Sequence, residues 1–273
     1  MVTEKNKFHL STSAARGYES HSVPAIFAPL AQATFDKVEL PENAQVLDIA
    51  CGTGIISRLL ADQLKGTGRL VGSDLNPAML EVAKELMPAS DHAVEWIEAD
   101  AGNLPFDADE FDALFCQQGL QFFPDKLATL REFHRVLKPG GHLYISCWSA
   151  VPALLKEIAR CLTERVNEDA ARKALAPFQF RDDELINSLL CEAGFDHVEK
   201  SVLHLSRRLH PGWESIRVQI LSSPYEKELR AKGDDMADAI ATDVEEALTK
   251  YRDGEDLVLP QESFLFQATK APA

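Results

Sequence analysis

One stretch, VLDIACGTGIISRLLA at residues 46–61, limits the possible folds more than any other. Apolar residues run up to a single carboxylate at Asp48, a turn punctuated by Gly52 and Gly54 follows, and apolar residues then recur at helical spacing. This pattern predicts a buried strand, a tight turn and an amphipathic helix. Such a turn lets a ligand approach the bare backbone, and the amides of the next helix point toward that ligand.

The alternation of strand and helix continues beyond this stretch. Strands are predicted to end at Asp74 and near Asp100, to run from Phe111 to Cys116, and to end at Trp148, with amphipathic helices after the second and fourth strands. Strand and helix in this order predict a parallel sheet that is covered on both faces.

Polar residues gather where these strands end. Asp48, Asp74, Asp100 and Gln117 all lie at predicted carboxyl ends. In sheets of this kind ligands bind beyond the carboxyl ends, near the point where the strand order reverses. The alternative for each carboxylate is a local role in capping a helix or a loop.

Composition and charge exclude several classes of protein. The chain has 273 residues, ordinary hydrophobic content of 45% and a net charge of −15, which argues against nucleic acid and anionic membrane surfaces as partners. It shows no signal-peptide core and no membrane-spanning window. Its five cysteines form no metal-ligand spacing. We therefore expect a cytoplasmic protein, monomeric or homodimeric, without disulfides or a metal.

Three types of ligand compete for the glycine turn. A dinucleotide fingerprint would need a third glycine where Ser57 stands, and a phosphate loop would need a Gly-Lys-Ser/Thr sequence that does not follow. Asp48 would repel a pyrophosphate but suits a cationic ammonium group. The pattern favours a ligand with an amino-acid end, a ribose and a base, and no phosphates.

Residues 43–148 resemble the class I S-adenosylmethionine-dependent methyltransferases, most closely the UbiE-type small-molecule subgroup. The likeness rests on VLDIACGTG, LVGSDLNPAML, EADAGNLPF and RVLKPGGHLYIS, in that order and at normal spacing. It implies an α/β, Rossmann-like, seven-stranded and mostly parallel sheet with an antiparallel last strand, helices on both faces and helical lid insertions. It also implies S-adenosyl-L-methionine as cofactor and a small-molecule methyl acceptor.

The resemblance implies which residues hold the cofactor. They are Tyr18, Asp48, Ala50, Cys51, Gly52, Gly54, Asp74, Leu75, Asp100, Ala101 and Gln117. Asp48 and the turn from Ala50 to Gly54 would hold the methionine portion. Asp74 would accept hydrogen bonds from the ribose hydroxyls, and Leu75 would pack on the adenine. Asp100 would bind the adenine amino group, Ala101 would supply a backbone amide, and Gln117 would line the methionine end.

The catalytic groups are less defined. Methyl transfer from a sulfonium is an in-line displacement, which alignment and desolvation can accelerate without a side-chain catalyst. His21 is a candidate general base and Gln118 a candidate polar contact to the acceptor. The alternative, a surface or capping histidine, is the interpretation that position 21 favours.

The chain divides into three predicted parts. Residues 1–40 form an N-terminal helical cap, residues 41–150 the cofactor-binding core, and residues 151–273 complete the sheet. Two late strands, HVEKSVLHLS and ESFLFQATK, flank a helical insertion. The insertions at about 151–178 and 207–258 are predicted to form a substrate lid.

Three other functions stay open at this point. A non-catalytic cofactor-binding protein of the same fold would share all the cofactor residues. A nucleic-acid methyltransferase is disfavoured by the acidic charge and by CQQG at residues 116–119, after the fourth strand. An NAD-dependent dehydrogenase is disfavoured by the missing third glycine.

Overall fold

The structure is a computed structural model that describes residues 11–64, 67–88, 93–233 and 235–273. Its chain forms two compact units. Unit 1 comprises Met1–Cys147, Asp182–Leu203 and Phe264–Ala273, and unit 2 comprises Trp148–Arg181 and His204–Ser263. The predicted boundary at residue 150 therefore lies close to the first passage from unit 1 to unit 2.

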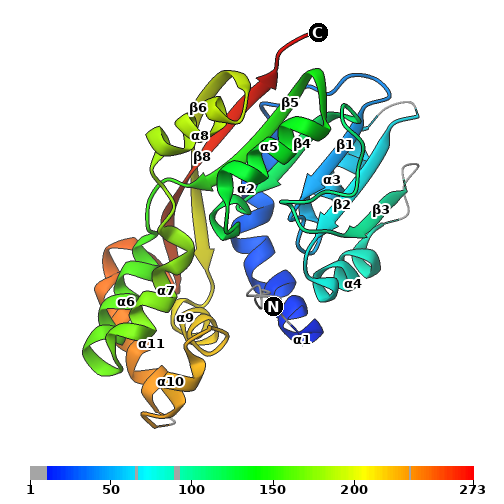
Figure 1. The fold of residues 1–273 in the computed structure, drawn as a ribbon. Helices are drawn as coiled ribbons and strands as arrows, with labels where there is room; N and C mark the ends of the chain where they lie inside the picture. The colour runs from blue at the N-terminus through cyan, green and yellow to red at the C-terminus, as the bar shows by residue number, and fades with distance from the viewer. Residues whose placement is uncertain (1–10, 65–66, 89–92, 234) are drawn as a thin grey trace, which may run out of the picture. The chain divides into compact units, whose positions relative to one another are not determined.

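The described strands form one sheet (Figure 1). Its strands lie in the order β3-β2-β1-β4-β5-β8-β6, and the short β7 pairs with β8. Their bounds are β1 Gln45–Ile49, β2 Arg69–Asp74, β3 Val94–Glu98, β4 Phe111–Gln117, β5 Leu137–Trp148, β6 Phe195–Leu209, β7 Arg252–Asp253 and β8 Asp256–Lys270. The two-residue β7 was not predicted.

Parallel pairing joins β1 to β2 and β4, β2 to β3, and β4 to β5. Strand β8 runs antiparallel to β6, because Thr269 bonds to Asp196 at one end while Glu262 bonds to His204 farther along. The predicted mostly parallel sheet with an antiparallel last strand is confirmed.

The strand order reverses between β1 and β4. Since crossovers between parallel strands are right-handed, α3 (Ile55–Gln63) and α4 (Pro77–Leu86) cover one face, and α5 (Lys126–Val136) covers the other. Helix α8 (Asp183–Glu192) packs beside α5. Asn76 and Asp125 cap α4 and α5 with their side chains, which fixes where these helices begin.

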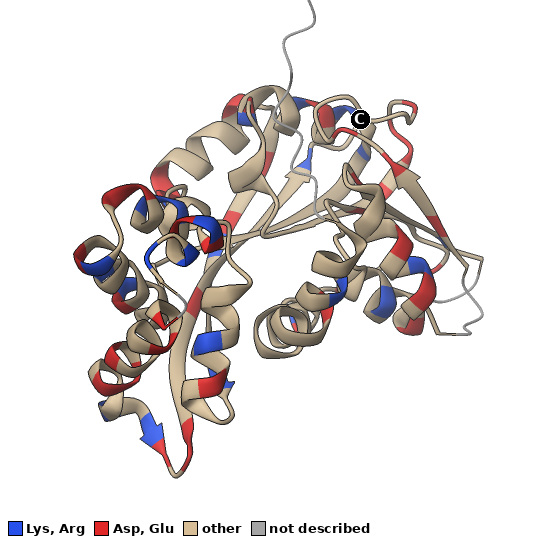
Figure 2. Ribbon diagram, turned by 90° about the horizontal axis from the view of Figure 1, so that it is seen from below, with Lys and Arg blue, Asp and Glu red and all other residues tan. Residues whose placement is uncertain are grey.

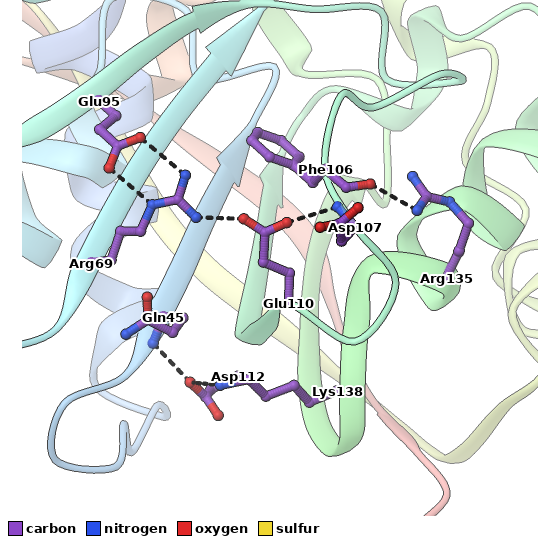
Figure 3. A network of polar contacts seen from close by, with 9 residues as sticks. All are labelled: Gln45, Arg69, Glu95, Phe106, Asp107, Glu110, Asp112, Arg135 and Lys138. Carbon is purple, nitrogen blue, oxygen red and sulfur yellow. Dashed lines mark hydrogen bonds and ion pairs between the residues drawn. The ribbon is translucent and has the colours of Figure 1, made fainter.

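A polar network ties together the amino-terminal halves of the central strands (Figure 3). Arg69 on β2 donates to Glu95 on β3 at 2.9 Å and to Glu110, just before β4, at 2.5 Å. Asp112 on β4 accepts from the Gln45 amide of β1 and from Lys138 of β5, both at 2.8 Å. These bonds fix the strand register at the end of the sheet opposite to the predicted ligand site.

The described part of the N-terminal segment is helical and belongs to unit 1. It consists of α1 (Thr12–Gly17), the π-helix η1 (Tyr18–Phe27) and α2 (Ala28–Phe35). Pro24 lies inside η1 and has no N–H to donate, and the wider π-turn is a form often found at functional sites. Helix α1 packs against α4, and Thr12 donates to Glu81 at 2.9 Å. Residues 1–10 lie outside the described residues.

Unit 2 is mainly helical. Its helices are α6 Ala153–Arg165, α7 Glu168–Leu175, α9 Gly212–Leu221, α10 Glu226–Arg230 and α11 Met236–Ala247, and α11 packs on α6 and α9. Short 3₁₀ helices complete the described chain: η2 (Leu120–Phe122) in unit 1, and η3 (Ala176–Phe178) and η4 (Thr249–Tyr251) in unit 2. Residues 207–209 and 256–258 extend β6 and β8, so the helical insertion is shorter than predicted.

Acidic residues are spread over helices and loops of both units and alternate with Lys and Arg along the same helices (Figure 2). In α6, for example, Arg160 pairs with both Glu157 and Glu164. Within the described residues no helix has the length and apolar character needed to cross a membrane.

Candidate functional site

The turn after β1 is built from left-handed backbone. Ala50 has φ 54°, Gly52 has φ 57° and Gly54 has φ 84°, and Gly54 begins helix α3. A side chain on Gly54 would also collide with the ring of Trp96, because its Cβ would lie 2.6 Å from that ring. On Gly52 a Cβ would meet only the Tyr18 ring, at 3.8 Å. At Gly54 both the left-handed backbone and the packing against Trp96 favour glycine, whereas at Gly52 the backbone conformation alone does.

Asp74 joins the end of β2 to this turn. One carboxylate oxygen accepts the Gly52 N–H at 2.9 Å, and the other accepts the Asn76 N–H at 2.8 Å. Burial raises the pKa of Asp74, although the N–H donors of Asn76, Gly52 and Leu75 oppose that rise. Each carboxylate oxygen has a second lone pair, so the group can still accept hydroxyl donors from a ligand.

Asp48 is the most buried carboxylate of the site, with 1% of its surface exposed. It accepts the Ser57 N–H at 3.0 Å and the Ser57 hydroxyl at 2.7 Å. Burial raises the pKa of Asp48 to about 7 in spite of these two bonds, and the charge of Asp74 adds to the rise. A carboxylate in this state is stabilised by any cation that comes near it.

The N-terminal segment lies over the turn through Tyr18. The Tyr18 ring packs on Phe27, with ring centroids 5.1 Å apart, and against the buried cluster of Ala15, Met79 and Val82. Burial and the charge of Asp74 raise the pKa of Tyr18, so its hydroxyl stays protonated. Tyr18 therefore remains a neutral group beside the carboxylates of the site.

A latch fastens the same segment to the turn: the side chains of Glu19 and Arg58 together with Thr53. Glu19 accepts the Thr53 hydroxyl at 2.5 Å and pairs with Arg58 at 2.8 Å, and Arg58 also donates to the Thr53 carbonyl at 2.6 Å. The side chains of Arg58 and Glu19 are 16% and 21% exposed, which makes this pair less screened by solvent than a surface ion pair.

Gln117, at the end of β4, fastens the segment a second time. Its Nε2 donates to the Phe27 carbonyl at 3.1 Å. Its Oε1 is buried and has no hydrogen-bond partner in the part of the chain that is described. A buried acceptor without a donor is destabilising, so this oxygen fits a ligand that donates hydrogen bonds.

The two candidate catalytic residues have different settings. Gln118 is 6% exposed, has φ 54°, and accepts from Gln121 at 3.3 Å. His21 is exposed, and its Nδ1 lies 3.0 Å from the Gly17 carbonyl and 2.8 Å from the Ser20 hydroxyl. Both contacts are with residues at most four positions away in the same N-terminal segment, as expected if His21 is a capping residue. Its role as a base stays a prediction.

The remaining predicted cofactor residues surround the ends of β2 and β3. Leu75 is 37% exposed directly after Asp74, although it is a large apolar side chain. Asp100 accepts the Gly102 N–H at 3.0 Å, and Ala101 is buried beside it. Cys51 is buried, and its N–H donates to the Ser73 carbonyl at 2.9 Å. No group of three or more His, Cys, Asp or Glu residues in the described ranges is arranged to hold a metal ion.

These donors and acceptors fit S-adenosylmethionine. The buried carboxylate of Asp48, the half-buried carboxylate of Asp74 and the buried oxygen of Gln117 surround the turn. The nearby cation, Arg58, is already paired with Glu19. This excess of negative charge favours an ammonium and a sulfonium and disfavours a pyrophosphate.

The latch and the hydrogen bond from Gln117 to the Phe27 carbonyl were not predicted from the sequence. Glu19 is 34 residues from Thr53 and 39 from Arg58, so no local spacing connects them.

Comparison with known proteins agrees with the geometry. Residues 46–141 match the family described as "Methyltransferase domain". The demethylmenaquinone methyltransferase of Staphylococcus saprophyticus is 30% identical over 175 residues, which cover 60% of this chain and 75% of that protein. The ubiquinone/menaquinone biosynthesis C-methyltransferase UbiE of Francisella philomiragia is 32% identical over 180 residues, or 61% of this chain and 72% of that protein.

Among solved structures, the phosphoethanolamine N-methyltransferase 2 of Haemonchus contortus, in complex with phosphomonomethylethanolamine and S-adenosylhomocysteine, aligns with a TM-score of 0.60. The alignment covers 95% of this chain and 57% of that one at 20% identity, so it establishes the shared fold.

Proposed function

The chain belongs to the UbiE-like family of S-adenosylmethionine-dependent methyltransferases, and we propose that it binds this cofactor at the carboxyl ends of β1, β2 and β4 in unit 1. The protein is an enzyme that methylates small molecules with S-adenosylmethionine as its cofactor. The bound cofactor supplies an activated methyl group on a sulfonium. The task of the chain is to bind both reactants, align them and exclude water.

Asp74 is proposed to take the ribose hydroxyls. Its carboxylate already holds the Gly52 amide in place, and the remaining lone pairs can accept two further donors. The exposed Leu75 would pack on the adenine ring, and Asp100 with Ala101 would bind its polar edge. This proposal rests on the hydrogen bond from the Gly52 N–H to Asp74, because it brings the carboxyl ends of β1 and β2 together.

Asp48 and Gln117 are proposed to receive the amino-acid end of the cofactor. An ammonium would neutralise the buried Asp48 carboxylate and donate to the unpartnered Gln117 oxygen. Gly52 with Ala50 and Cys51 would form the backbone floor, Gly54 would hold that floor against Trp96, and Tyr18 would cover it.

The acceptor is proposed to be a small molecule with its own nucleophilic oxygen, nitrogen or carbon. The relatives are named for methylation of quinone precursors, but the family match ends at residue 141, before unit 2 begins at Trp148. We therefore assign the acceptor's identity to the helices of unit 2, the predicted lid. Alignment and desolvation, with Gln118 as a polar contact, would provide the acceleration. We place the reaction in the cytoplasm.

Methyl-labelled S-adenosylmethionine tests the proposal. The full chain is incubated with a cell extract, and label is measured in molecules below and above 1 kDa by mass spectrometry. Label in the small molecules, lost with Asp74→Asn, is expected. Label only in macromolecules would indicate a polymer acceptor. Tight binding of S-adenosylhomocysteine without any transfer would identify a non-catalytic cofactor-binding protein.

A further inference from the structure

Strand β6 carries a cation on its apolar face. Its last residues alternate strictly: Leu205, Arg207 and Leu209 are buried or half-buried, whereas Ser206 and Arg208 are exposed. Because successive strand residues point to opposite faces, Arg207 lies on the same face as the two leucines. A charged residue at such a position breaks the pattern that otherwise defines this face.

Arg207 has little to neutralise it. Its Nη2 donates to the neutral Gln219 oxygen of α9 at 2.7 Å, and its Nε is buried and has no partner among the described residues. Burial alone lowers the pKa of Arg207 to about 10, with no contribution from a neighbouring carboxylate. The next residue, Arg208, pairs with both Asp253 and Asp256.

An arrangement of this kind is unfavourable without a ligand. A guanidinium that loses its water needs a counter-charge and a partner for each N–H. Arg207 is only half-buried as a whole residue, so part of it stays accessible. The partner that this guanidinium lacks among the described residues is thus an acceptor with negative charge.

We propose that Arg207 and Gln219 form a binding site in unit 2 for the carboxylate of the methyl acceptor. The planar guanidinium matches a carboxylate with two parallel hydrogen bonds, and the Gln219 amide adds a donor beside it. Leu205 and Leu209 flank Arg207 on the same face, which indicates an apolar body attached to the carboxylate. This inference rests on the proposed function, since it names the chemical class of the acceptor.

Benzoate and its neutral counterpart benzamide test the site in the full chain saturated with S-adenosylhomocysteine. Calorimetry is expected to give benzoate binding at least tenfold tighter than benzamide binding. Arg207→Gln should abolish this preference, and the matched control Arg208→Gln should keep it. Equal binding of the two probes, no benzoate binding, or a preference that survives in Arg207→Gln would overturn the proposal.

A stability measurement distinguishes a ligand site from a structural arginine. Arg207→Met removes a buried charge, so its Tm is expected to equal or exceed that of the native chain. A Tm lower by several degrees would assign Arg207 to the fold and overturn the proposal. Binding of S-adenosylhomocysteine is measured in the same samples. If the native chain does not bind S-adenosylhomocysteine, the proposed function itself is refuted.

Discussion

Units 1 and 2 differ in how each holds a buried charge. In unit 1, Asp48 accepts two hydrogen bonds from Ser57, and Asp74 accepts backbone N–H groups at both of its oxygens. In unit 2, Arg207 has one neutral side-chain partner and a buried Nε without any among the described residues. Hydrogen bonds within the protein hold Asp48 and Asp74 in place before a ligand binds. Arg207, by contrast, needs a ligand to supply its missing partner.

The difference has a chemical meaning for a methyltransferase. The family match covers residues 46–141, which lie within unit 1, where the cofactor is proposed to bind. Unit 2 begins at Trp148, beyond that match, and its Arg207 is proposed to select the acceptor. Four variants and one labelling experiment test these differences between the two units.

The largest effect is expected at Gly54. Alanine there would combine a positive φ with a Cβ that lies 2.6 Å from the Trp96 ring. We expect the free energy of unfolding to fall by about 3 kcal/mol or more. Gly140→Ala is the matched control, because Gly140 has φ 78° and nothing within 4 Å of its Cβ position, and it should cost about 1 kcal/mol. Equal losses in chemical denaturation would contradict the packing role of Gly54.

Asp48 should make stability depend on pH. Its pKa is about 7 in the fold and 3.8 in a carboxyl open to water, so between these values the native state binds the proton more tightly than the unfolded chain does. Stability should therefore fall as pH rises from about 4 to 7, by about 4 kcal/mol at most, and then level off. Asp48→Asn should remove this component. Denaturant midpoints of both proteins at pH 5 and pH 8 measure it, and a pH-independent difference between them would refute the raised pKa.

Asp74→Asn should weaken the binding of S-adenosylhomocysteine about tenfold to a hundredfold, because charge-assisted hydrogen bonds to the ribose hydroxyls are lost. Asp36→Asn is the control and should bind normally, because the Asp36 carboxylate accepts from Gln32 at the end of α2, away from the turn. Calorimetry measures the dissociation constant of S-adenosylhomocysteine for both variants. An unchanged dissociation constant for the Asp74 variant would reduce this residue to a turn-forming role.

The latch should have a smaller effect. Glu19→Gln removes the charge that pairs with Arg58 but keeps an acceptor for Thr53, so cofactor affinity should fall about threefold to tenfold. Glu85→Gln breaks the exposed pair with Arg16 in the same segment and should change little. If the two variants bind S-adenosylhomocysteine equally well, the latch does not position the turn.

Features that depend on neighbouring residues could be predicted from the sequence, whereas contacts between distant residues could not. The strand ends, the glycine turn and the order of elements in unit 1 follow from local patterns, namely apolar runs, periodicity and turn residues. The latch between Glu19 and Arg58 joins residues far apart in the chain, and only the fold brings them together. The alternation of β6 continues to Leu209, and reading it beyond residue 206 would have placed Arg207 on the apolar face.

Unit 1 is proposed to recognise a cationic cofactor, and unit 2 an anionic acceptor. Small molecules of a cell extract are separated by anion exchange, and each fraction is incubated with the full chain and methyl-labelled S-adenosylmethionine. Label is expected in molecules retained by the anion exchanger, and this label should fall at least tenfold with Arg207→Gln and stay unchanged with Arg208→Gln. Label confined to the unretained, neutral or cationic molecules would contradict the proposal.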